Sequence, residues 1–450
     1  MKVAVIGAGI IGVTTAYELA ADGHQVTVFE RSGSVAAGTS FANAGIVAPG
    51  YVSPWAAPGM PAKVLRGLFS THTPVRLHAT MDMGTLRWLW KAWRASRLKP
   101  YQANRAAMHG LASYSRDRLH ELVRTLNLDY ERADGYLVLL RGERELAGIQ
   151  PGLQLLTELG QKHRLLDAAE CRQVEPGLSA DTELRAGVHL PQDEVGNCRQ
   201  FAHLMKTEAQ RLGVQFRFHT TVQHLSPGAK PQLMHQYTPP GESLGSAQEA
   251  ANSELASVAG PETQPMVMGP VLEDFDAVVV CAAMGAPALL RPHGLKLPMA
   301  PVYGYSITAP LRHIEAHPDF GPRAGLMDER YKVAISRLGH RVRVAGSAEF
   351  GGAPEAMNKS AIATLYKVLH DWFPGAAQNG KLQHWKGARP MLPDGPPVLG
   401  ACGIPGIWLN LGHGSSGWAL SCGSARVLAD QVAGRTPAVK TEGLGVERLR

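Results

Sequence analysis

The first thirty residues show a pattern of apolar runs and glycines that predicts a strand, a tight turn, a helix and a second strand. Val3–Ile6 is an apolar run of the length of a buried strand, and Gln25–Phe29 is a second one. Between them, the helical pattern of Ile10–Ala21 stops before Gly23, a residue that commonly ends helices. This order of elements predicts a β-α-β unit at the start of the chain.

Apolar runs recur along the rest of the chain, but they do not continue the same regular alternation. Residues 60–120 have a helical pattern rich in Trp, Arg and Leu. Further strands are predicted over Tyr136–Leu140, Gly187–Leu190, Val214–Phe218, Phe275–Cys281, Val302–Ile307, Lys332–Ile335, Arg341–Ala345 and Ile407–Leu411, and helices over Arg199–Leu212, Ser360–Trp372 and Trp418–Val432. The β-α-β pattern is therefore interrupted and completed late.

This interruption predicts an α/β fold with two domains built from discontinuous stretches. We predict a Rossmann-like domain over residues 1–58, 191–300 and 391–450, interrupted by an α+β substrate domain of sheet and helices over residues 59–190 and 301–390. Residues 225–272 are rich in Pro, Gly, Ser, Ala and Gln and lack apolar periodicity. We expect a flexible insertion there.

Composition narrows the class of protein without choosing a function. The chain has 450 residues, of which 45% are apolar and 18% charged, and no apolar stretch approaches the roughly 18 residues of a transmembrane helix. The net charge of +7 suits an anionic substrate, an anionic cofactor or a membrane surface equally. No nucleic-acid partner is expected, because no long Lys/Arg run or nucleic-acid-binding motif is present. The five cysteines are scattered without a C-x-x-C pair, so we expect a reducing, cytoplasmic compartment and no metal site.

The turn after the first strand carries the first chemical signal. Gly7, Gly9 and Gly12 form a G-x-G-x-x-G motif between a predicted strand and a predicted helix. In such turns the first glycine makes the bend, the second lets the backbone approach a pyrophosphate, and the third lets the helix pack on the strand. Glu30, at the end of the second strand, is placed to accept hydrogen bonds from a ribose. The motif predicts a dinucleotide site, and the interrupted domain is typical of flavoproteins, which favours FAD over NAD.

Two further glycine-rich stretches are candidates for the same site. Residues 38–45 include Thr39, Ser40 and Asn43, whose hydroxyl and amide groups can bind phosphate, although a plain turn is the alternative. Residues 412–417 form a glycine turn between a predicted strand and a predicted helix. The N-terminus of that helix could face the flavin pyrimidine and stabilise negative charge on the reduced ring.

Several motifs together resemble the FAD-dependent D-amino-acid oxidase-like superfamily, and within it the bacterial D-amino-acid dehydrogenases of small-subunit type. They are the N-terminal glycine motif, Thr39–Gly45, Pro49–Gly59, Leu190–Glu194, Gly387–Gly395, and Asn410–Gly414 with Gly417 and Trp418. The likeness covers nearly the whole chain, and the segment around Trp55 is more specific than the glycine motifs. Residues 225–272 depart from the pattern, which has a short hairpin there.

The resemblance implies which residues bind FAD, and that they do so noncovalently because no cysteine lies in the Gly387–Gly395 motif. The implied FAD-binding residues are Val3, Ala4, Val5, Ile6, Gly7, Ala8, Gly9, Ile10, Ile11, Gly12, Val13, Glu30, Arg31, Thr39, Ser40, Asn43, Ala44, Gly45, Val222, Gly285, Gly412, His413, Gly414 and Gly417. His413 is placed by its backbone; its side chain contacts the flavin or belongs to the loop.

Arg389 is the leading candidate for substrate binding. A guanidinium can make two parallel hydrogen bonds to an amino-acid carboxylate, and in similar oxidases an arginine of this motif does so. The structural alternative is an ion pair with the nearby Asp394. Tyr303, Tyr305 and Tyr331 are candidates for a second hydrogen bond, and the resemblance favours Tyr331; a packing role is the alternative for each.

The resemblance implies oxidative deamination of D-amino acids to 2-oxo acids and ammonia, with hydride transfer from Cα to FAD N5 and electrons passed to a non-oxygen acceptor such as a membrane quinone. No general base stands out, which fits a reaction driven by the neutral amine. Two alternatives stay open. One is an oxygen-using oxidase of glycine, sarcosine or proline type, and the other is a noncatalytic flavin-binding subunit.

A tryptophan-rich helix bears on the acceptor. Within residues 86–94, helical spacing gathers Leu86, Leu89, Trp90 and Trp93 on one face and basic residues on another. Such a helix could lie on the inner face of an anionic membrane, which suits transfer of electrons to a membrane quinone. The alternative is an amphipathic helix packed on its own domain.

Overall fold

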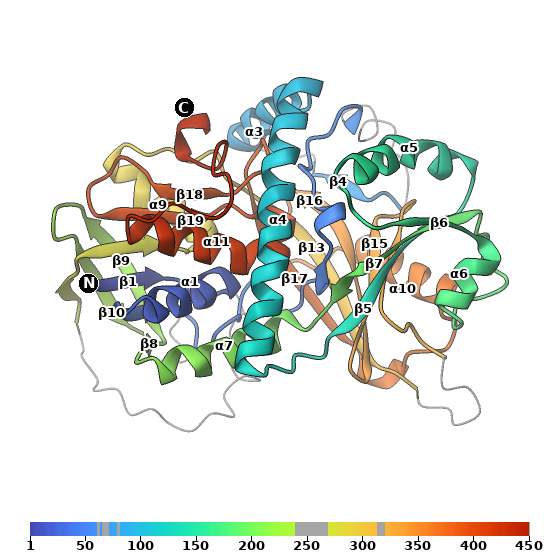
Figure 1. Ribbon diagram of the computed structural model, residues 1–450, viewed down its shortest axis with the longest axis horizontal. Helices are drawn as coiled ribbons and strands as arrows, with labels where there is room; N and C mark the ends of the chain where they lie inside the picture. The colour runs from blue at the N-terminus through green and yellow to red at the C-terminus, as the bar shows by residue number, and fades with distance from the viewer. Residues whose placement is uncertain (61–63, 65–71, 79–81, 239–268, 313–319, 450) are drawn as a thin grey trace.

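The predicted α/β fold is confirmed by the computed structural model, which describes residues 1–60, 64, 72–78, 82–238, 269–312 and 320–449 (Figure 1). The opening unit matches the apolar pattern closely. Strand β1 spans Lys2–Ile6, helix α1 spans Ile10–Ala21 and strand β2 spans Gln25–Phe29. All three elements are largely buried, which is why they stand out in the sequence as apolar runs.

The parallel sheet has the order β18-β19-β12-β1-β2-β8. Its other strands are β8 (Gln215–Arg217), β12 (Ala277–Val280), β18 (Val398–Ala401) and β19 (Ile407–Leu411). Neighbours run parallel except β18, which is antiparallel to β19. Strand β1 lies between β2 and β12, so residues about 270 positions apart complete the centre of the sheet, as Val3 opposite Ala277 shows.

The mixed sheet forms the other half of the molecule, at the right of Figure 1. Its main path runs β17-β13-β16-β15-β14-β5-β7-β3, with β4 beside β16 and β6 beside β7. These strands are β3 (Ile46–Val47), β4 (Val75–Leu77), β5 (Ala133–Leu140), β6 (Arg164–Asp167), β7 (Ala186–Val195), β13 (Ala300–Pro310), β14 (Gly325–Asp328), β15 (Val333–Leu338), β16 (Arg341–Phe350) and β17 (Gln383–Met391). The division of residues between two domains stays a prediction.

The expected insertion differs from the structure at both of its ends. Strands β9 (Thr220–Ser226), β10 (Gln232–Tyr237) and β11 (Val271–Asp274) form a small antiparallel sheet in the order β11-β10-β9. Leu225 and Leu233 fill a core with Phe29 of β2, so this part is anchored despite its many prolines and polar residues. Residues 239–268, the centre of the predicted insertion, lie outside the described residues.

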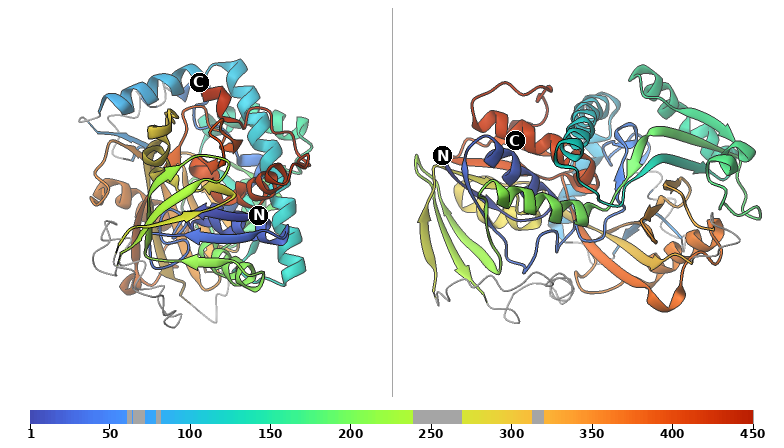
Figure 2. Two further views of the ribbon diagram at one scale, coloured as in Figure 1. Left: turned by 90° about the vertical axis from the view of Figure 1, so that its left-hand side faces the viewer. Right: turned by 60° about the horizontal axis from the view of Figure 1, so that its bottom comes forward.

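The helices fill the space around and between the sheets (Figures 1 and 2). They are α3 (Met83–Ala95), α4 (Leu98–Leu126), α5 (Glu143–Glu158), α6 (Ala168–Val174), α7 (Cys198–Arg211), α9 (Ala286–Leu290), α10 (Lys359–Trp372) and α11 (Gly417–Val432). Helix α4 runs between the two halves, and α10 covers one face of the mixed sheet. In the part of the chain that is described, no helix combines the length and apolar character needed to cross a bilayer.

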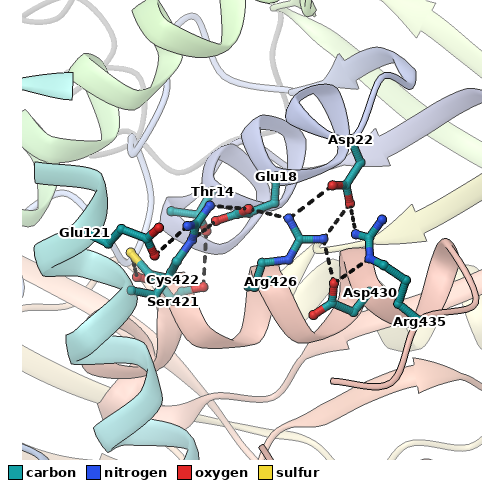
Figure 3. Close-up of polar contacts among 10 residues, drawn as sticks. Thr14, Glu18, Asp22, Glu121, Ser421, Cys422, Arg426, Asp430 and Arg435 are labelled. Carbon is teal, nitrogen blue, oxygen red and sulfur yellow. Dashed lines mark hydrogen bonds and ion pairs between the residues drawn. The ribbon is translucent and has the colours of Figure 1, made fainter. Parts of the chain in front are cut away.

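A buried ionic network joins α1, α4 and α11 (Figure 3). Glu18 of α1 is fully buried, and its carboxylate accepts hydrogen bonds from Nε of Arg118 at 2.7 Å and Nη1 of Arg426 at 2.8 Å. Arg426 also pairs with Asp22 and Asp430. The pKa of the Arg118 and Arg426 guanidiniums is raised because their hydrogen bonds and charge pairs outweigh burial. The network holds the helix that follows the glycine turn.

Candidate functional site

The glycine turn has room at one position only. Gly7 has a φ of +102°, and a Cβ there would lie 2.8 Å from the carbonyl oxygen of Cys281. A Cβ on Gly12 would lie 1.8 Å from the carbonyl oxygen of Gly7. A Cβ on Gly9, by contrast, would meet nothing nearer than Oγ of Ser40 at 3.5 Å. The protein itself therefore requires two of the glycines, whereas Gly9 leaves open space at the start of α1, as a pyrophosphate needs.

Other predicted cofactor residues gather around this turn. The Glu30 carboxylate accepts hydrogen bonds from the backbone N–H of Ala8 at 2.6 Å and of Ser32 at 2.8 Å. Oγ of Ser40 accepts from the backbone N–H of Ile10 at 3.1 Å. Because α1 has no side-chain cap on Gly9, its N-terminus keeps its positive potential toward an anion. The arrangement fits the ADP end of FAD.

Further predicted positions lie along the strands that flank the turn. Residues Val3 to Ile6 point alternately into two cores, one under α1 and one with β19, so their side chains shape the sheet. The backbone N–H of Thr220, at the start of β9, donates to the carbonyl of Glu30 at 2.8 Å and brings Val222 close to that end of β2. Gly285 follows β12 in a short 3₁₀ turn, and Arg31 is exposed.

We predict that Gly9→Ala folds but binds FAD about tenfold or more weakly, because the methyl group displaces a phosphate from backbone N–H donors. Flavin absorbance per mole of protein and titration of the apoprotein with FAD measure this. Gly12→Ala is the matched control, because its Cβ clashes with the protein backbone and the variant should lose folding as well as FAD. Full FAD binding by Gly9→Ala would contradict the assignment.

The loop at residues 39–45 joins the two sheets. Oγ1 of Thr39 donates to the carbonyl of Ala388 in β17 at 2.7 Å, and Oγ of Ser306 in β13 donates to the carbonyl of Ala42 at 2.8 Å. Likewise, Oγ of Ser336 in β15 donates to the carbonyl oxygen of Ala44 at 2.7 Å. The loop therefore lies against one face of the mixed sheet, directly beside the start of α1.

Asn43 and Gly45 have structural partners within this loop. Oδ1 of Asn43 accepts from the backbone N–H of Gly45 at 2.9 Å, and Gly45 has a φ of +75°. The carbonyl of Gly45 accepts from Nε1 of Trp418 in α11 at 3.2 Å. Asn43 therefore shapes a turn whose carbonyl contacts the second glycine-rich segment.

The second glycine turn belongs to the same sheet as the first, with β12 between their strands, and the helix that follows it shares a core with α1. The turn follows β19, and α11 begins at Gly417 without a side-chain cap. His413 is buried, its Nε2 is 2.9 Å from Oγ of Ser424 in α11, and burial lowers its pKa to about 3. Its imidazole is therefore neutral at physiological pH and fixes the turn on α11. A small hollow beside Met391 is lined by residues of this turn and by Ser53 and Trp55.

Arg389 lies on the face of the mixed sheet that bears this loop. It stands opposite Val302 in β13, and a Cβ on the adjoining Gly304 would lie 2.3 Å from Nη2 of Arg389. Nη1 of Arg389 donates to the carbonyl of Ser347 at 2.8 Å. No carboxylate oxygen of the described residues lies within 4.0 Å of its guanidinium, and burial lowers its pKa to about 10.

The ion pair considered for Arg389 and Asp394 is absent from the described residues. Oδ2 of Asp394 instead accepts from Nε of Arg448 at 2.8 Å. Arg389 is thus a desolvated cation with a neutral carbonyl partner and donors to spare. A desolvated charge without a counter-ion is costly, and a ligand carboxylate relieves that cost.

The tyrosines do not join Arg389. Side chains alternate along β13, so Gly304 lies on the same face of the sheet as Arg389, whereas Tyr303 and Tyr305 point to the opposite face. Tyr305 is buried under α10 and its hydroxyl donates to Glu349, and Tyr303 lies 4.3 Å from Nζ of Lys386. Tyr331 belongs to the same α10 core, with its ring 5.1 Å from Cζ of Arg141. These positions match the packing alternative.

Two neighbours of Arg389, Gly304 and Ser347, were not predicted from the sequence. Gly304 has a sequence signal, since a glycine inside a strand often marks a close approach of other atoms. Ser347 has none, because its φ of 65° appears only once β16 has formed. The buried pair of Lys386 and Glu349, with Nζ and Oε2 3.6 Å apart, was also not predicted. It lies on the face of the sheet opposite to Arg389.

We predict that Gly304→Ala raises KM for the amino acid by about tenfold or more, because the methyl group pushes the Arg389 guanidinium out of place. FAD binding should be retained, since β13 is not part of the glycine turn. Steady-state kinetics and flavin absorbance measure the two effects. Gly148→Ala, where a Cβ meets nothing within 4 Å, is the matched control. An unchanged KM would argue against the contact.

The Leu190–Glu194 segment contains a buried acid that makes stability depend on pH. Asp193 of β7 is 2% exposed, its Oδ2 has no hydrogen-bond partner, and burial raises its pKa to about 7. The folded state therefore favours the protonated form, and the stability that this group contributes is full below about pH 4 and lost as the pH rises through 7. Asp193→Asn should raise the unfolding free energy at pH 8 by on the order of 3 kcal/mol and leave it nearly unchanged at pH 4. Urea denaturation at both pH values tests this; equal effects would refute it.

Comparison with known proteins identifies the family of the chain. The DAO family of FAD-dependent oxidoreductases matches residues 2–431. The D-amino acid dehydrogenase of Cereibacter sphaeroides is 41% identical over 450 residues, covering 100% of this chain and 95% of its own, and that of Rhizorhabdus wittichii is 39% identical, covering 100% of both. The crystal structure of glycine oxidase from Geobacillus kaustophilus shares the fold, with a TM-score of 0.69, 19% identity and coverage of 99% of this chain and 98% of its own. The chain therefore belongs to the DAO family of FAD-dependent oxidoreductases.

Proposed function

We propose that this protein is a D-amino-acid dehydrogenase that deaminates its substrate oxidatively with noncovalently bound FAD. The observation that carries the proposal is Arg389, a desolvated cation without a carboxylate partner in the described residues, on the sheet face that bears the cofactor loop. The names of the similar D-amino acid dehydrogenases support the choice of substrate.

The residues that would hold FAD are those around the two glycine turns and the loop at 39–45. Gly9 and the start of α1 suit its pyrophosphate, Glu30 suits a ribose, and Ser40, whose Oγ lies at the start of α1, would be next to the phosphates. When bound, FAD supplies the acceptor for the hydride that leaves Cα of the amino acid. No cysteine lies in the Arg389 segment, which favours a noncovalent cofactor.

The contribution of the protein is binding and orientation. Arg389 would hold the substrate carboxylate through two parallel hydrogen bonds, so that Cα faces the cofactor side of the mixed sheet. The neutral amine supplies its own electron pair, and the resulting imino acid hydrolyses to a 2-oxo acid and ammonia. His413 holds its turn in place through its contact with Ser424.

The electron acceptor in this proposal is a quinone of the membrane and not oxygen, with the protein on the cytoplasmic side. An anaerobic panel tests the function: D- and L-alanine, glycine, sarcosine, and D- and L-proline are added in turn to the FAD-loaded protein, and flavin bleaching is followed. We expect D-alanine to bleach the flavin and L-alanine not to. The reduced protein should then be reoxidised faster by a soluble quinone than by air. Bleaching by glycine or sarcosine with rapid peroxide formation would instead indicate an oxidase, and no bleaching at all a binding subunit.

A further inference from the structure

A cavity of about 440 Å³ lies in the half of the molecule that holds the parallel sheet. Three segments form its walls: residues 293–297 after α9, residues 402–404 between β18 and β19, and residues 446 and 449 near the C-terminus. Helix α9 and both strands lie at the left of Figure 1. The volume is within the range of small-molecule sites, roughly 300–1,000 Å³, and none of the residues assigned to FAD or substrate lines the cavity.

The cavity lies at the opposite end of the parallel sheet from the candidate FAD site. The two glycine turns follow the carboxyl ends of β1 and β19, where nucleotides bind in sheets of this kind. Residues 402–404 instead precede β19. The backbone N–H of Val278, near the start of β12, donates to the carbonyl of Gly406 at 2.9 Å, so this turn adjoins the amino ends of the strands. The cavity is therefore separate from the cofactor site.

The walls of the cavity are mainly apolar. Their side chains belong to the core that also contains residues of β12 and β19. The nearly or fully buried ones are Leu297, Cys402 and Val446, and the partly buried ones are Leu295, Ile404 and Leu449. Such walls suit a hydrocarbon chain, because its burial between them removes the apolar surface of both partners from water.

Two contacts outside the cavity hold its walls in place. The backbone N–H of Gly228, in the turn between β9 and β10, donates to the carbonyl of Pro405 at 3.1 Å. Nε of Arg448 donates to Oδ2 of Asp394 at 2.8 Å and thereby holds the last 3₁₀ turn, Val446–Leu449, against the segment after β17. The cavity is thus preformed, so a ligand need not order its walls on binding.

One part of the lining presents groups that can donate hydrogen bonds but lack acceptors. Nε2 of His293 is buried and has no hydrogen-bond partner in the described residues. Lys296 is exposed, and no described carboxylate oxygen lies within 4.0 Å of its ammonium. The backbone N–H of Gly403 likewise has no acceptor in the part of the chain that is described. No acid of the described residues lines the cavity, so this part favours an anion.

We propose that this cavity binds a monocarboxylate with an apolar chain, of the class of medium-chain fatty acids. The carboxylate would accept from Lys296, from Nε2 of His293 and from the backbone N–H of Gly403, while the chain lies between the apolar walls. A single lysine matches one carboxylate better than a phosphate dianion. An apolar side chain of a protein partner would fill the walls but leave the donors without acceptors. The inference does not depend on the proposed function.

Calorimetric titration of the FAD-loaded protein with octanoate, below its micelle concentration, tests the site. We expect octanoate to bind, octanol to bind at least about tenfold more weakly, and acetate and inorganic phosphate not to bind measurably. Lys296→Gln should weaken octanoate binding about threefold or more, and Lys296→Glu about tenfold or more. Lys162→Gln, which changes an exposed lysine outside the cavity, is the matched control and should bind normally.

A second variant tests the apolar walls. Ile404→Trp places a larger side chain in the cavity and should weaken octanoate binding about tenfold or more, with wild-type circular dichroism and flavin absorbance. If this variant does not fold, the Lys296 series still decides. Arg389→Ala, loaded with FAD, should bind octanoate as the wild type does, because the substrate site lies elsewhere.

Three results would overturn the proposal: no binding of octanoate by the wild type, unchanged binding by Lys296→Glu, or loss of binding in Arg389→Ala, which would place octanoate in the substrate site. The titration needs no turnover. A failed bleaching panel would therefore refute the proposed function without affecting this cavity, and a failed titration would refute the cavity ligand without affecting the function.

Discussion

Arg389→Ala is expected to lower kcat/KM for D-alanine by about 30-fold to several thousand-fold, which corresponds to a loss of roughly 2–5 kcal/mol of transition-state binding. The guanidinium is desolvated against Gly304, and among the described residues its hydrogen-bond partner is the carbonyl of Ser347. No described residue supplies a counter-ion for Arg389, so a substrate carboxylate would fill that role. Anaerobic reduction of the flavin in a stopped-flow instrument separates binding from the chemical step.

Two comparisons make this result specific to the carboxylate. Arg389→Lys keeps the charge but loses the paired hydrogen bonds, so it should recover only part of the activity. The wild type should prefer D-alanine strongly over ethylamine, which lacks the carboxylate, and Arg389→Ala should lose most of this preference. FAD content must stay at the wild-type level. A variant with normal kcat/KM would remove Arg389 from the site.

Glu18→Gln is expected to lower the free energy of unfolding by about 3 kcal/mol, the lower end of the cost of breaking a buried charge pair, because Arg118 keeps Glu121 and Arg426 keeps Asp22 and Asp430 as partners. Arg118 and Arg426 both bind this fully buried carboxylate, and their side chains are only 17% and 13% exposed. The Glu18→Gln substitution should also weaken FAD binding, because Glu18 lies on the helix that begins at the glycine turn. Urea denaturation of the apoprotein, followed by circular dichroism, measures the stability.

Glu121→Gln provides the matched control for this network. Glu121 also pairs with Arg118, with Oε2 and Nη1 2.7 Å apart, but its side chain is 52% exposed. Pairs exposed to water contribute about 0–1 kcal/mol, so this variant should be nearly as stable as the wild type. If the two substitutions had equal effects, burial would not be what gives Glu18 its importance.

The sequence alone identified the elements whose signal is local. The glycine turns and the apolar runs placed β1, α1, β2, β19 and α11 within one or two residues, because elements buried on most sides form continuous apolar runs bounded by turn residues. The faces of β13 needed the structure. Two-residue spacing shows that Tyr303 and Tyr305 share a face, but only the pairing of β13 with β17 shows that Arg389 is on the other one.

Helix α3 illustrates a second limit of prediction from the sequence. Its pattern correctly indicated an amphipathic helix, but the residues that pack inward are Trp88 and Ala92, and Trp90 and Trp93 are exposed. A periodic pattern describes the two faces of a helix without stating which one meets the protein and which one meets another phase. Residues 225–272 show the same limit for a sheet, since β10 is held by tertiary contacts that its polar composition does not reveal.

The position of β1 in the parallel sheet also determines when the protein can fold during synthesis. Its neighbour β12 begins at Ala277, and β19, which adjoins β12, ends at Leu411. The ribosome must therefore add roughly 400 residues after the glycine turn before that sheet can close, a delay on the order of tens of seconds. Strand β2 can pair with one edge of the first strand early, but the other edge has no partner until β12 is made. We therefore expect nascent chains truncated before β12 to remain dependent on chaperones and unable to retain FAD.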